Sequence, residues 1–183
     1  MAPPRPDPGP AVDHRSPSIE HREPRAEQPD MTIEIRNETT YVVDENEFVD
    51  CARFVFEAMH LNPATEMSIL FVDEDAMEKL HVQWLDLPGP TDVMSFPMDE
   101  LTPGSAEHPA PEGLLGDVVL CPSVAAKQAA EAGHSAVEEM LLLTCHSILH
   151  LLGYDHMEED ERKVMFDLQR QLLLTFLASR GKS

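Results

Sequence analysis

HSILHLLGYDH, residues 146–156, places three histidines within eleven residues. His146 and His150 are four positions apart, so on a helix their imidazoles lie on one side, one turn apart. Gly153 can end that helix in a left-handed conformation and turn the chain so that His156 faces the other two. Three imidazoles with a fourth position left for water are typical of a catalytic zinc site. We therefore predict one zinc ion per chain, bound by His146, His150 and His156.

The helix that carries the first two histidines has sequence signals at both of its ends. Ser135 and Glu138 match a capping box, and the helix is expected to run from there to Leu152. A preceding helix is predicted over residues 122–132, with Pro122 at its start and Gly133 just past its end. A following helix is predicted over residues 158–178, because acidic residues begin it and basic residues follow it.

Apolar periodicity predicts the elements in the first half of the chain. Alternating or short apolar runs indicate strands within residues 31–40, 67–73, 90–99 and 116–122. Helical spacing indicates helices over residues 45–61 and 74–85, and Asp73 is the expected N-cap of the second. Residues 98–115 are rich in proline and glycine and are expected to form a long loop. The element order predicts an α+β domain with one four-stranded mixed sheet and about five helices.

Length and composition indicate one folded domain with a tail. The chain has 183 residues, enough for one domain with a sizeable core. Residues 1–30 are rich in proline and charge and are predicted to be a disordered tail, so residues 31–183 are the expected domain. No run of eighteen apolar residues is present, and because proline and charge interrupt the first residues we expect no secretory signal. Three cysteines without a C-x-x-C pair are expected to be buried thiols, and we expect a cytoplasmic protein without membrane contact.

The charge balance limits the ways in which this protein could bind nucleic acid. Thirteen basic side chains against 34 acidic ones give a formal net charge of -21. A surface of that sign repels polyanions such as RNA. Any role on RNA therefore requires a local binding site or a basic partner protein.

The spacing H-x-x-x-H-x-x-G-x-x-H is also that of the metzincin proteases, and it predicts a metalloprotease-like zinc-binding fold. In those proteases a glutamate follows the first histidine and acts as the general base. Ser147 occupies that position here and cannot do the same work. Zinc still lowers the pKa of bound water to about 7, which suits attack on a phosphodiester.

Three segments resemble the YbeY family of bacterial endoribonucleases and rRNA maturation factors. HSILHLLGYDH resembles the family pattern H-G-x-L-H-L-x-G-Y-D-H, and PTDVMSFP (90–97) and LGDVVLCP (115–122) resemble two further family segments in the same order. The similarity spans about residues 31–178. It implies a zinc-dependent single-strand endoribonuclease that acts in small-subunit rRNA maturation and ribosome quality control. Its implied partners are rRNA and the small ribosomal subunit, and its implied zinc ligands are His146, His150 and His156.

Two positions depart from the family pattern. Ser147 stands where many members have glycine, a small-for-small change. Leu85 stands where many members have an arginine that would be expected to contact phosphate or stabilise negative charge in the transition state. No lysine or arginine lies between Lys79 and Lys127. The matched segments 90–97 and 115–122 therefore contain no lysine or arginine that could contact RNA phosphate.

Beyond a metal-bound water, the sequence identifies only candidate residues for the cleft. Asp92 and Ser95 could line it, although Asp92 and Thr91 could instead cap a turn. Asp155 could orient a ligand imidazole or bond backbone amides at its turn, and the second is favoured. Trp84 is expected in the core rather than as a platform for stacked bases.

Two other functions remain compatible with these residues. One is a ribosome-associated binding factor with a mainly structural zinc, because an acidic protein binds basic ribosomal proteins readily. The other is a metalloprotease, which only the histidine spacing favours. No feature of the sequence indicates an oligomeric state.

Overall fold

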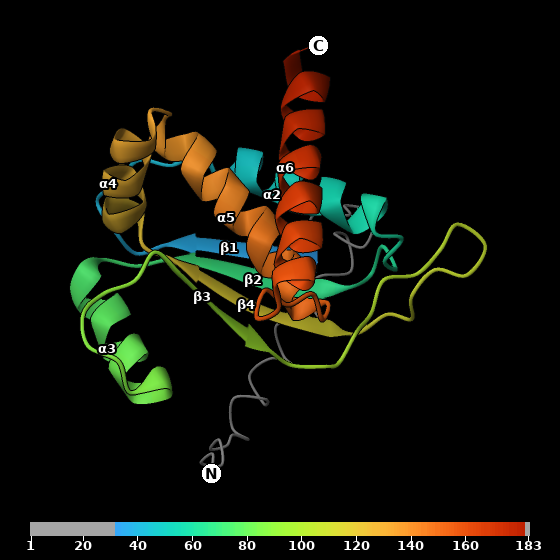
Figure 1. Ribbon diagram of the computed structural model, residues 1–183, viewed down its shortest axis with the longest axis horizontal. Helices are drawn as coiled ribbons and strands as arrows, with labels where there is room; N and C mark the ends of the chain where they lie inside the picture. Colours follow the sequence, from blue (N-terminus) through green and yellow to red (C-terminus); the bar gives the residue numbers. More distant parts are fainter. Residues whose placement is uncertain (1–31, 182–183) are drawn as a thin grey trace, which may run out of the picture. The chain divides into compact units, whose positions relative to one another are not determined.

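The computed structural model describes residues 32–181, and the predicted tail and Met31 lie outside this range. The described residues form four strands and five helices, and Figure 1 shows how these are arranged. The strands are β1 (Ile33–Asn37), β2 (Glu66–Phe71), β3 (Val93–Pro97) and β4 (Leu114–Leu120). The helices are α2 (Glu45–Ala58), α3 (Glu74–Leu85), α4 (Pro122–Ala132), α5 (Ala136–Leu151) and α6 (Glu159–Gly181). Each predicted strand and helix is present, and the α+β prediction is confirmed.

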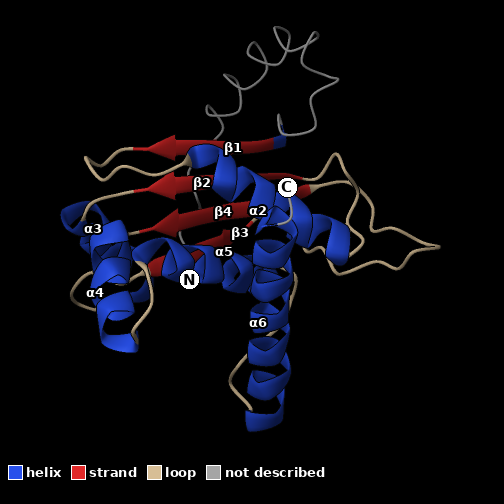
Figure 2. Cartoon of the chain, turned by 90° about the horizontal axis from the view of Figure 1, so that it is seen from above, coloured by secondary structure: helices blue, strands red, loops and turns tan. Residues whose placement is uncertain are grey.

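The four strands form one mixed sheet in the order β1-β2-β4-β3. β1 and β4 both run parallel to β2, whereas β3 runs antiparallel to β4. β3 therefore lies at one edge of the sheet, next to α5 (Figure 2). The predicted mixed sheet is confirmed, and its only antiparallel strand is the one that carries Ser95.

The two faces of the sheet bury two separate sets of side chains, because successive residues of a strand point to opposite faces. One face contributes Met67, Ile69 and Val118 to the large core, which also contains side chains of α2, α5 and α6. The other face contributes Met94 and Val119 to a smaller core with α3. The histidine helix α5 thus packs in the large core, on the face of the sheet opposite α3. None of the helices in residues 32–181 is long and apolar enough to span a lipid bilayer.

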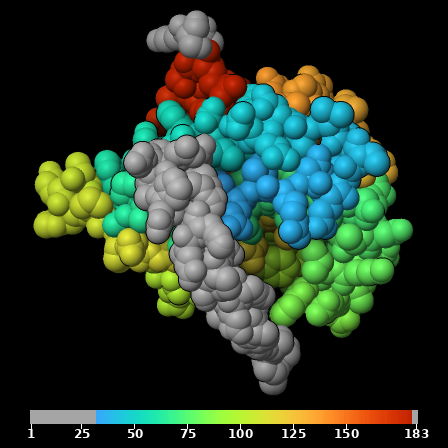
Figure 3. Space-filling model, turned by 180° about the vertical axis from the view of Figure 1, so that it is seen from behind, coloured from blue at the N-terminus to red at the C-terminus, as the bar shows by residue number. Residues whose placement is uncertain are grey.

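The long loop between β3 and β4 is anchored to the end of α2. The Gly104 amide donates to the Met59 carbonyl and the Ala110 amide to the His60 carbonyl, both at 3.0 Å. Leu101 and Ala110 are buried in the large core. The tip of the loop stands away from the rest of the domain (Figure 3).

β4 contains an irregularity at Gly116 that only glycine can occupy. Leu114 pairs with Glu66 and Gly116 with Met67, so one extra residue of β4 bulges out of the ladder. Gly116 has φ +148°, and a Cβ there would lie 2.3 Å from the Phe96 carbonyl oxygen and 3.2 Å from Leu151 Cδ2. The missing side chain lets β3 and the last turn of α5 approach β4 closely.

All three cysteines are buried, as predicted, and no disulfide links them. The Cys51 and Cys145 sulfurs are 3.8 Å apart, between α2 and α5. The hydrogen bond with Cys145, together with burial, raises the pKa of the Cys51 thiol well above its usual value. Cys51 therefore stays a neutral, packed thiol, as expected for a buried small hydrophobe.

Candidate metal centre

Helix α5 presents His146 and His150 on a side that the core leaves uncovered. The Ser135 hydroxyl caps the helix by accepting a hydrogen bond from the Glu138 amide at 3.1 Å, as the sequence predicted. Nine of the sixteen residues of α5 are buried, which fixes its position against the sheet and the neighbouring helices. His146 is half-buried and His150 is exposed. The two imidazoles therefore project from a rigid helix toward solvent.

The turn after α5 brings the third histidine back toward the first two. Gly153 has φ +103°, a conformation that glycine adopts without steric cost. Its amide donates to the His150 carbonyl and the Tyr154 amide to the Leu149 carbonyl, both at 3.0 Å, as in a Schellman motif. His156 follows at once, and its amide donates to Asp155 Oδ1 at 2.6 Å. Asp155 thus bonds the backbone of the turn, the favoured one of its two predicted roles.

The three imidazole rings form a triangle. Ring centres are 5.5 Å apart for His146 and His156, 6.1 Å for His150 and His156, and 6.3 Å for His146 and His150. Three imidazoles on one tetrahedral zinc, with Zn–N about 2.0–2.1 Å, have ring centres about 5 Å apart. As the side chains stand, no three His, Cys, Asp or Glu residues within 32–181 are arranged to hold a metal ion. The donor set fits zinc, because side-chain rotation alone closes a difference of about 1 Å.

Gln169 of α6 fixes the orientation of the His146 ring. His146 Nδ1 lies 2.8 Å from Gln169 Oε1, and because an amide oxygen only accepts, Nδ1 carries the proton. Nε2 is then the nitrogen that is free to bind a metal. Burial lowers the pKa of the His146 imidazole, and the charges of His156 and His150 add to this effect. The ring is therefore held neutral, the form that binds metal ions.

Asp92 and Ser95, the two predicted cleft residues, differ in their relation to the histidines. The Asp92 charge raises the pKa of His146 against the effect of burial, so the carboxylate lies within electrostatic range of that ring. With its amide nitrogen turned toward Asp92, Gln128 donates to Oδ2 at 2.9 Å, and Thr91 Oγ1 donates to Oδ1 at 3.3 Å. Ser95 is half-buried in β3, and no side-chain hydrogen bond within residues 32–181 joins it to the histidines.

The side chain of Ser147 is fully buried and makes no hydrogen bond to any described residue. A buried hydroxyl without a partner costs about 1–3 kcal/mol, and alanine is also the better helix former. We expect Ser147→Ala to raise the free energy of unfolding by about 1 kcal/mol, measured by urea denaturation. Ser147→Gly, the residue of many family members, should instead lower it, because glycine destabilises a helix interior. If the wild type and Ser147→Ala were equally stable, the claim that the Ser147 hydroxyl is buried without a hydrogen-bond partner would be contradicted.

The prediction that Trp84 belongs to the core is wrong. Its side chain is 41% exposed at the end of α3 and packs edge-on against Phe96, with ring centres 5.8 Å apart. Leu85, the residue in place of the family arginine, is 54% exposed beside it. Both belong to the sheet face opposite the histidine helix, because Phe96 packs in the smaller core. Neither Trp84 nor Leu85 therefore belongs to the candidate metal centre.

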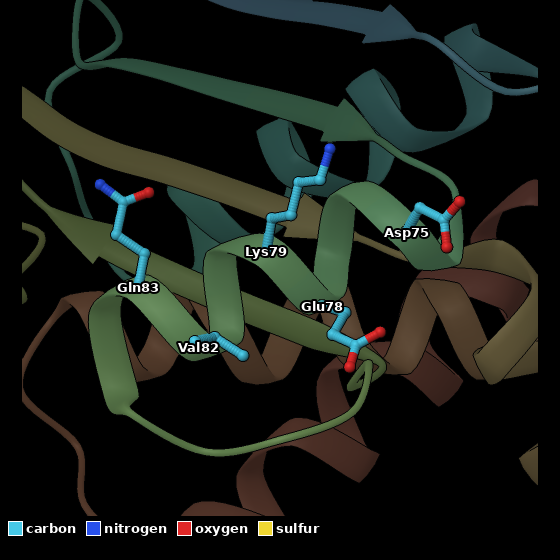
Figure 4. A pocket seen from close by; sticks show the side chains of 5 residues that line it. All are labelled: Asp75, Glu78, Lys79, Val82 and Gln83. Carbon is cyan, nitrogen blue, oxygen red and sulfur yellow. The ribbon is translucent and has the colours of Figure 1, made fainter.

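A pocket on α3 is separate from the histidines. It has a volume of about 420 Å³ and is lined by Asp75, Glu78, Lys79, Val82 and Gln83, which Figure 4 shows along one side of that helix. None of these residues contacts His146, His150 or His156. The candidate centre is instead an open surface between α5, the turn at residues 153–158 and α6.

Comparison with known proteins identifies many relatives. The sequence model of the family described as "Endoribonuclease YbeY" matches residues 32–177. The protein named Endoribonuclease YbeY of Beutenbergia cavernae is 62% identical over 150 residues, which cover 82% of this chain and 100% of that protein. The protein of the same name from Clavibacter sepedonicus is 57% identical over 153 residues, 83% of this chain and 100% of that protein.

A solved structure shares the fold. The solution structure of TM1509 from Thermotoga maritima superposes with a TM-score of 0.58 and 24% sequence identity. The superposition covers 82% of this chain and 92% of that one. At this identity the likeness concerns the fold alone, and it agrees with the α+β domain described above.

Proposed function

The chain belongs to the YbeY family of endoribonucleases, and we propose that it is a zinc-dependent enzyme that cleaves single-stranded RNA. The proposal includes one zinc ion per chain and a role in small-subunit rRNA maturation and ribosome quality control in the cytoplasm. The observation that carries it is the triangle of imidazoles on α5 and its following turn, with ring centres 5.5–6.3 Å apart.

Nε2 of His146, with the imidazoles of His150 and His156, would hold the zinc. When bound, zinc supplies Lewis-acid chemistry, polarising a phosphodiester and making water acidic enough to attack near neutral pH. Neutral imidazoles leave the charge of the ion uncompensated, which favours an anionic substrate. The exposure of His150 leaves that side of the centre open to an RNA strand.

Residues around the triangle would position the reacting groups. Ser147 points into the core and cannot serve as the base that the metzincin glutamate provides. Asp92 is the carboxylate whose charge reaches His146, and Gln128 and Thr91 hold it in place. We assign Asp92 the task of orienting the attacking water or accepting a proton from it. Asp92 is a better candidate for this role than Ser95.

Zinc dependence is tested on the full chain with a small-subunit rRNA precursor. Protein stripped with a chelator should lose cleavage, and one equivalent of zinc per chain should restore it. Metal content is measured in parallel on the same samples. Cleavage by a protein that contains and binds no zinc would contradict the proposal.

Gln169→Leu is expected to weaken zinc binding by about 10–100-fold, because it removes the acceptor that fixes the His146 tautomer. Competition with a chromophoric chelator measures the affinity directly. Gln169→Glu should restore it, since a carboxylate also accepts from Nδ1. Gln171→Leu, at an exposed position on the same helix, is the matched control. Equal affinities of the wild type and Gln169→Leu would show that the hydrogen bond does not support the ligand.

A second candidate function is ribosome binding without chemistry, which the net charge of -21 favours. Under this alternative, acidic surfaces bind basic ribosomal proteins and zinc is mainly structural. Sedimentation of the folded His150→Ala variant with small ribosomal subunits separates the two functions. Full binding together with absence of cleavage by the wild type would favour this alternative.

A further inference from the structure

Helix α6 forms a wall of the candidate metal centre. The Phe166 ring centre lies 6.3 Å from that of His146 and 6.2 Å from that of His156. Gln169, less than one turn further along the helix, bonds His146. Figure 1 and Figure 2 both show the first half of α6 beside the end of α5. Phe166 is nevertheless 39% exposed, so one side of its ring faces solvent next to the imidazoles.

Two arginines flank Phe166 on the same side of the helix. Arg162 lies four residues before Phe166 and Arg170 four residues after it. Each arginine is therefore about 6 Å from Phe166 along the helix axis. Arg162 Nε donates to the His156 carbonyl at 3.3 Å, which holds that guanidinium at the turn of the third histidine. Arg170 is exposed, and no residue within 32–181 pairs with its guanidinium. Arg162, Phe166 and Arg170 are called the α6 stripe below.

Neighbouring charges distinguish the α6 stripe from the rest of the helix. Lys163 is already paired with Asp167 at 3.0 Å. Acidic residues occupy the first turn of α6 and would repel phosphate there, which limits contact to Arg162 and the residues after it. The matched segments elsewhere contain no cation from Lys79 to Lys127, and Leu85 replaces the family arginine. The α6 stripe therefore places one arginine at the turn of the third histidine and a second arginine one helical turn beyond Phe166, on the same side of the helix.

We propose that the α6 stripe binds the single-stranded RNA substrate beside the metal centre. Phe166 stacks on one base next to the bond that is cut, and Arg162 and Arg170 bind the flanking phosphates. An aromatic platform between cationic side chains is the chemistry by which proteins hold single strands without reading a sequence. This inference rests on the proposed function, since it takes RNA as the ligand.

The test measures binding of the full-length protein to a fluorescein-labelled 12-nucleotide RNA by anisotropy at 4 °C, with gels to verify that the RNA stays intact. The double variant Arg162→Gln/Arg170→Gln removes both guanidiniums. Lys163→Gln, on the same helix, is the control for loss of positive charge. Phe166→Leu removes the ring, Phe166→Tyr retains it, and Val164→Ala is the control for loss of exposed apolar surface. Circular dichroism checks the fold of every variant.

The double arginine variant should bind about tenfold more weakly, and the slope of log affinity against log salt should fall by about 1.4, or 0.7 per phosphate contact. Lys163→Gln should leave the slope unchanged. Phe166→Leu should weaken binding by about fivefold or more, and Phe166→Tyr should restore it. At one position of the RNA, replacement of the nucleotide by an abasic one should weaken binding by the wild type by about the same fivefold. The same replacement should leave binding by Phe166→Leu unchanged.

The outcomes separate this inference from the proposed function. A wild type that neither binds nor cuts RNA would overturn both. A wild type that cuts RNA with zinc, while the variants of the α6 stripe bind like their controls, would overturn the inference alone. An abasic penalty that is equal in wild type and Phe166→Leu would exclude stacking on this ring.

Discussion

His150→Ala is expected to lower kcat/KM for RNA cleavage by more than about 100-fold. Loss of a residue that merely supports a metal ligand costs about 10–100-fold, so loss of a direct ligand should cost more. His150 is the most informative of the three histidines to replace. It is exposed, whereas His146 is half-buried and hydrogen-bonded to Gln169. Its removal should therefore affect metal binding without loss of core packing.

The matched control for His150→Ala is His108→Ala in the long loop. His108 is exposed and its hydrogen bonds, to Ser105, are made by its backbone. Both variants are purified identically and assayed for cleavage, zinc content and thermal stability, which also controls for contaminating ribonuclease. If His150→Ala cleaved RNA at the same rate as His108→Ala, His150 would not be a ligand of the metal centre.

Gly116→Ala is expected to lower the free energy of unfolding by about 3 kcal/mol or more. A backbone conformation open only to glycine costs about 1–3 kcal/mol for another residue, and overpacking costs about as much again. The added Cβ would lie 2.3 Å from the Phe96 carbonyl oxygen. The backbones of Phe96 and Gly116 cannot move apart easily, because β3 and β4 hold each other in register. Urea denaturation of the full chain measures the loss.

Gly133→Ala is the control that separates conformation from collision. Gly133 also has a positive φ, +84°, but nothing lies within 4 Å of a Cβ built there. It should cost only about 1 kcal/mol, the penalty of a left-handed residue. If the two substitutions proved equally costly, close packing of β3 and α5 against the bulge would not be the reason for glycine at position 116.

Sequence signals that act within a few residues predicted most of this fold. The Ser135 cap, the Asp73 cap of α3 and the turn at Gly153 all occur where the sequence placed them. Each is formed by hydrogen bonds or dihedral preferences within about five residues, so single-sequence reasoning can find it. The same holds for the histidines, whose spacing of four on a helix places two of them on one side.

Features that depend on contacts between distant segments were not predictable. The position of β4 between β2 and β3 results from packing of whole strands. Gln169 lies 23 residues beyond His146 on another helix, and no local pattern links the two. The residue type of Trp84 predicts a core position, but Trp84 lies outside the smaller core at the end of α3, and its ring is 41% exposed. Asp92 was identified from its segment, but its charge reaches His146 only because α5 packs against β3.

The burial of α5 also determines how the domain opens. Amide hydrogen exchange is slowest in segments that open only on global unfolding, and α5 is enclosed by the sheet, α2, α4 and α6. Residues 153–158 after it are mostly exposed, and Met157 is 75% accessible to solvent. We therefore expect His146 and His150 to lie in the slowest-exchanging unit, and His156 to lie in a segment that opens without global unfolding. Local opening of this turn can separate the third imidazole from the other two while the domain stays folded.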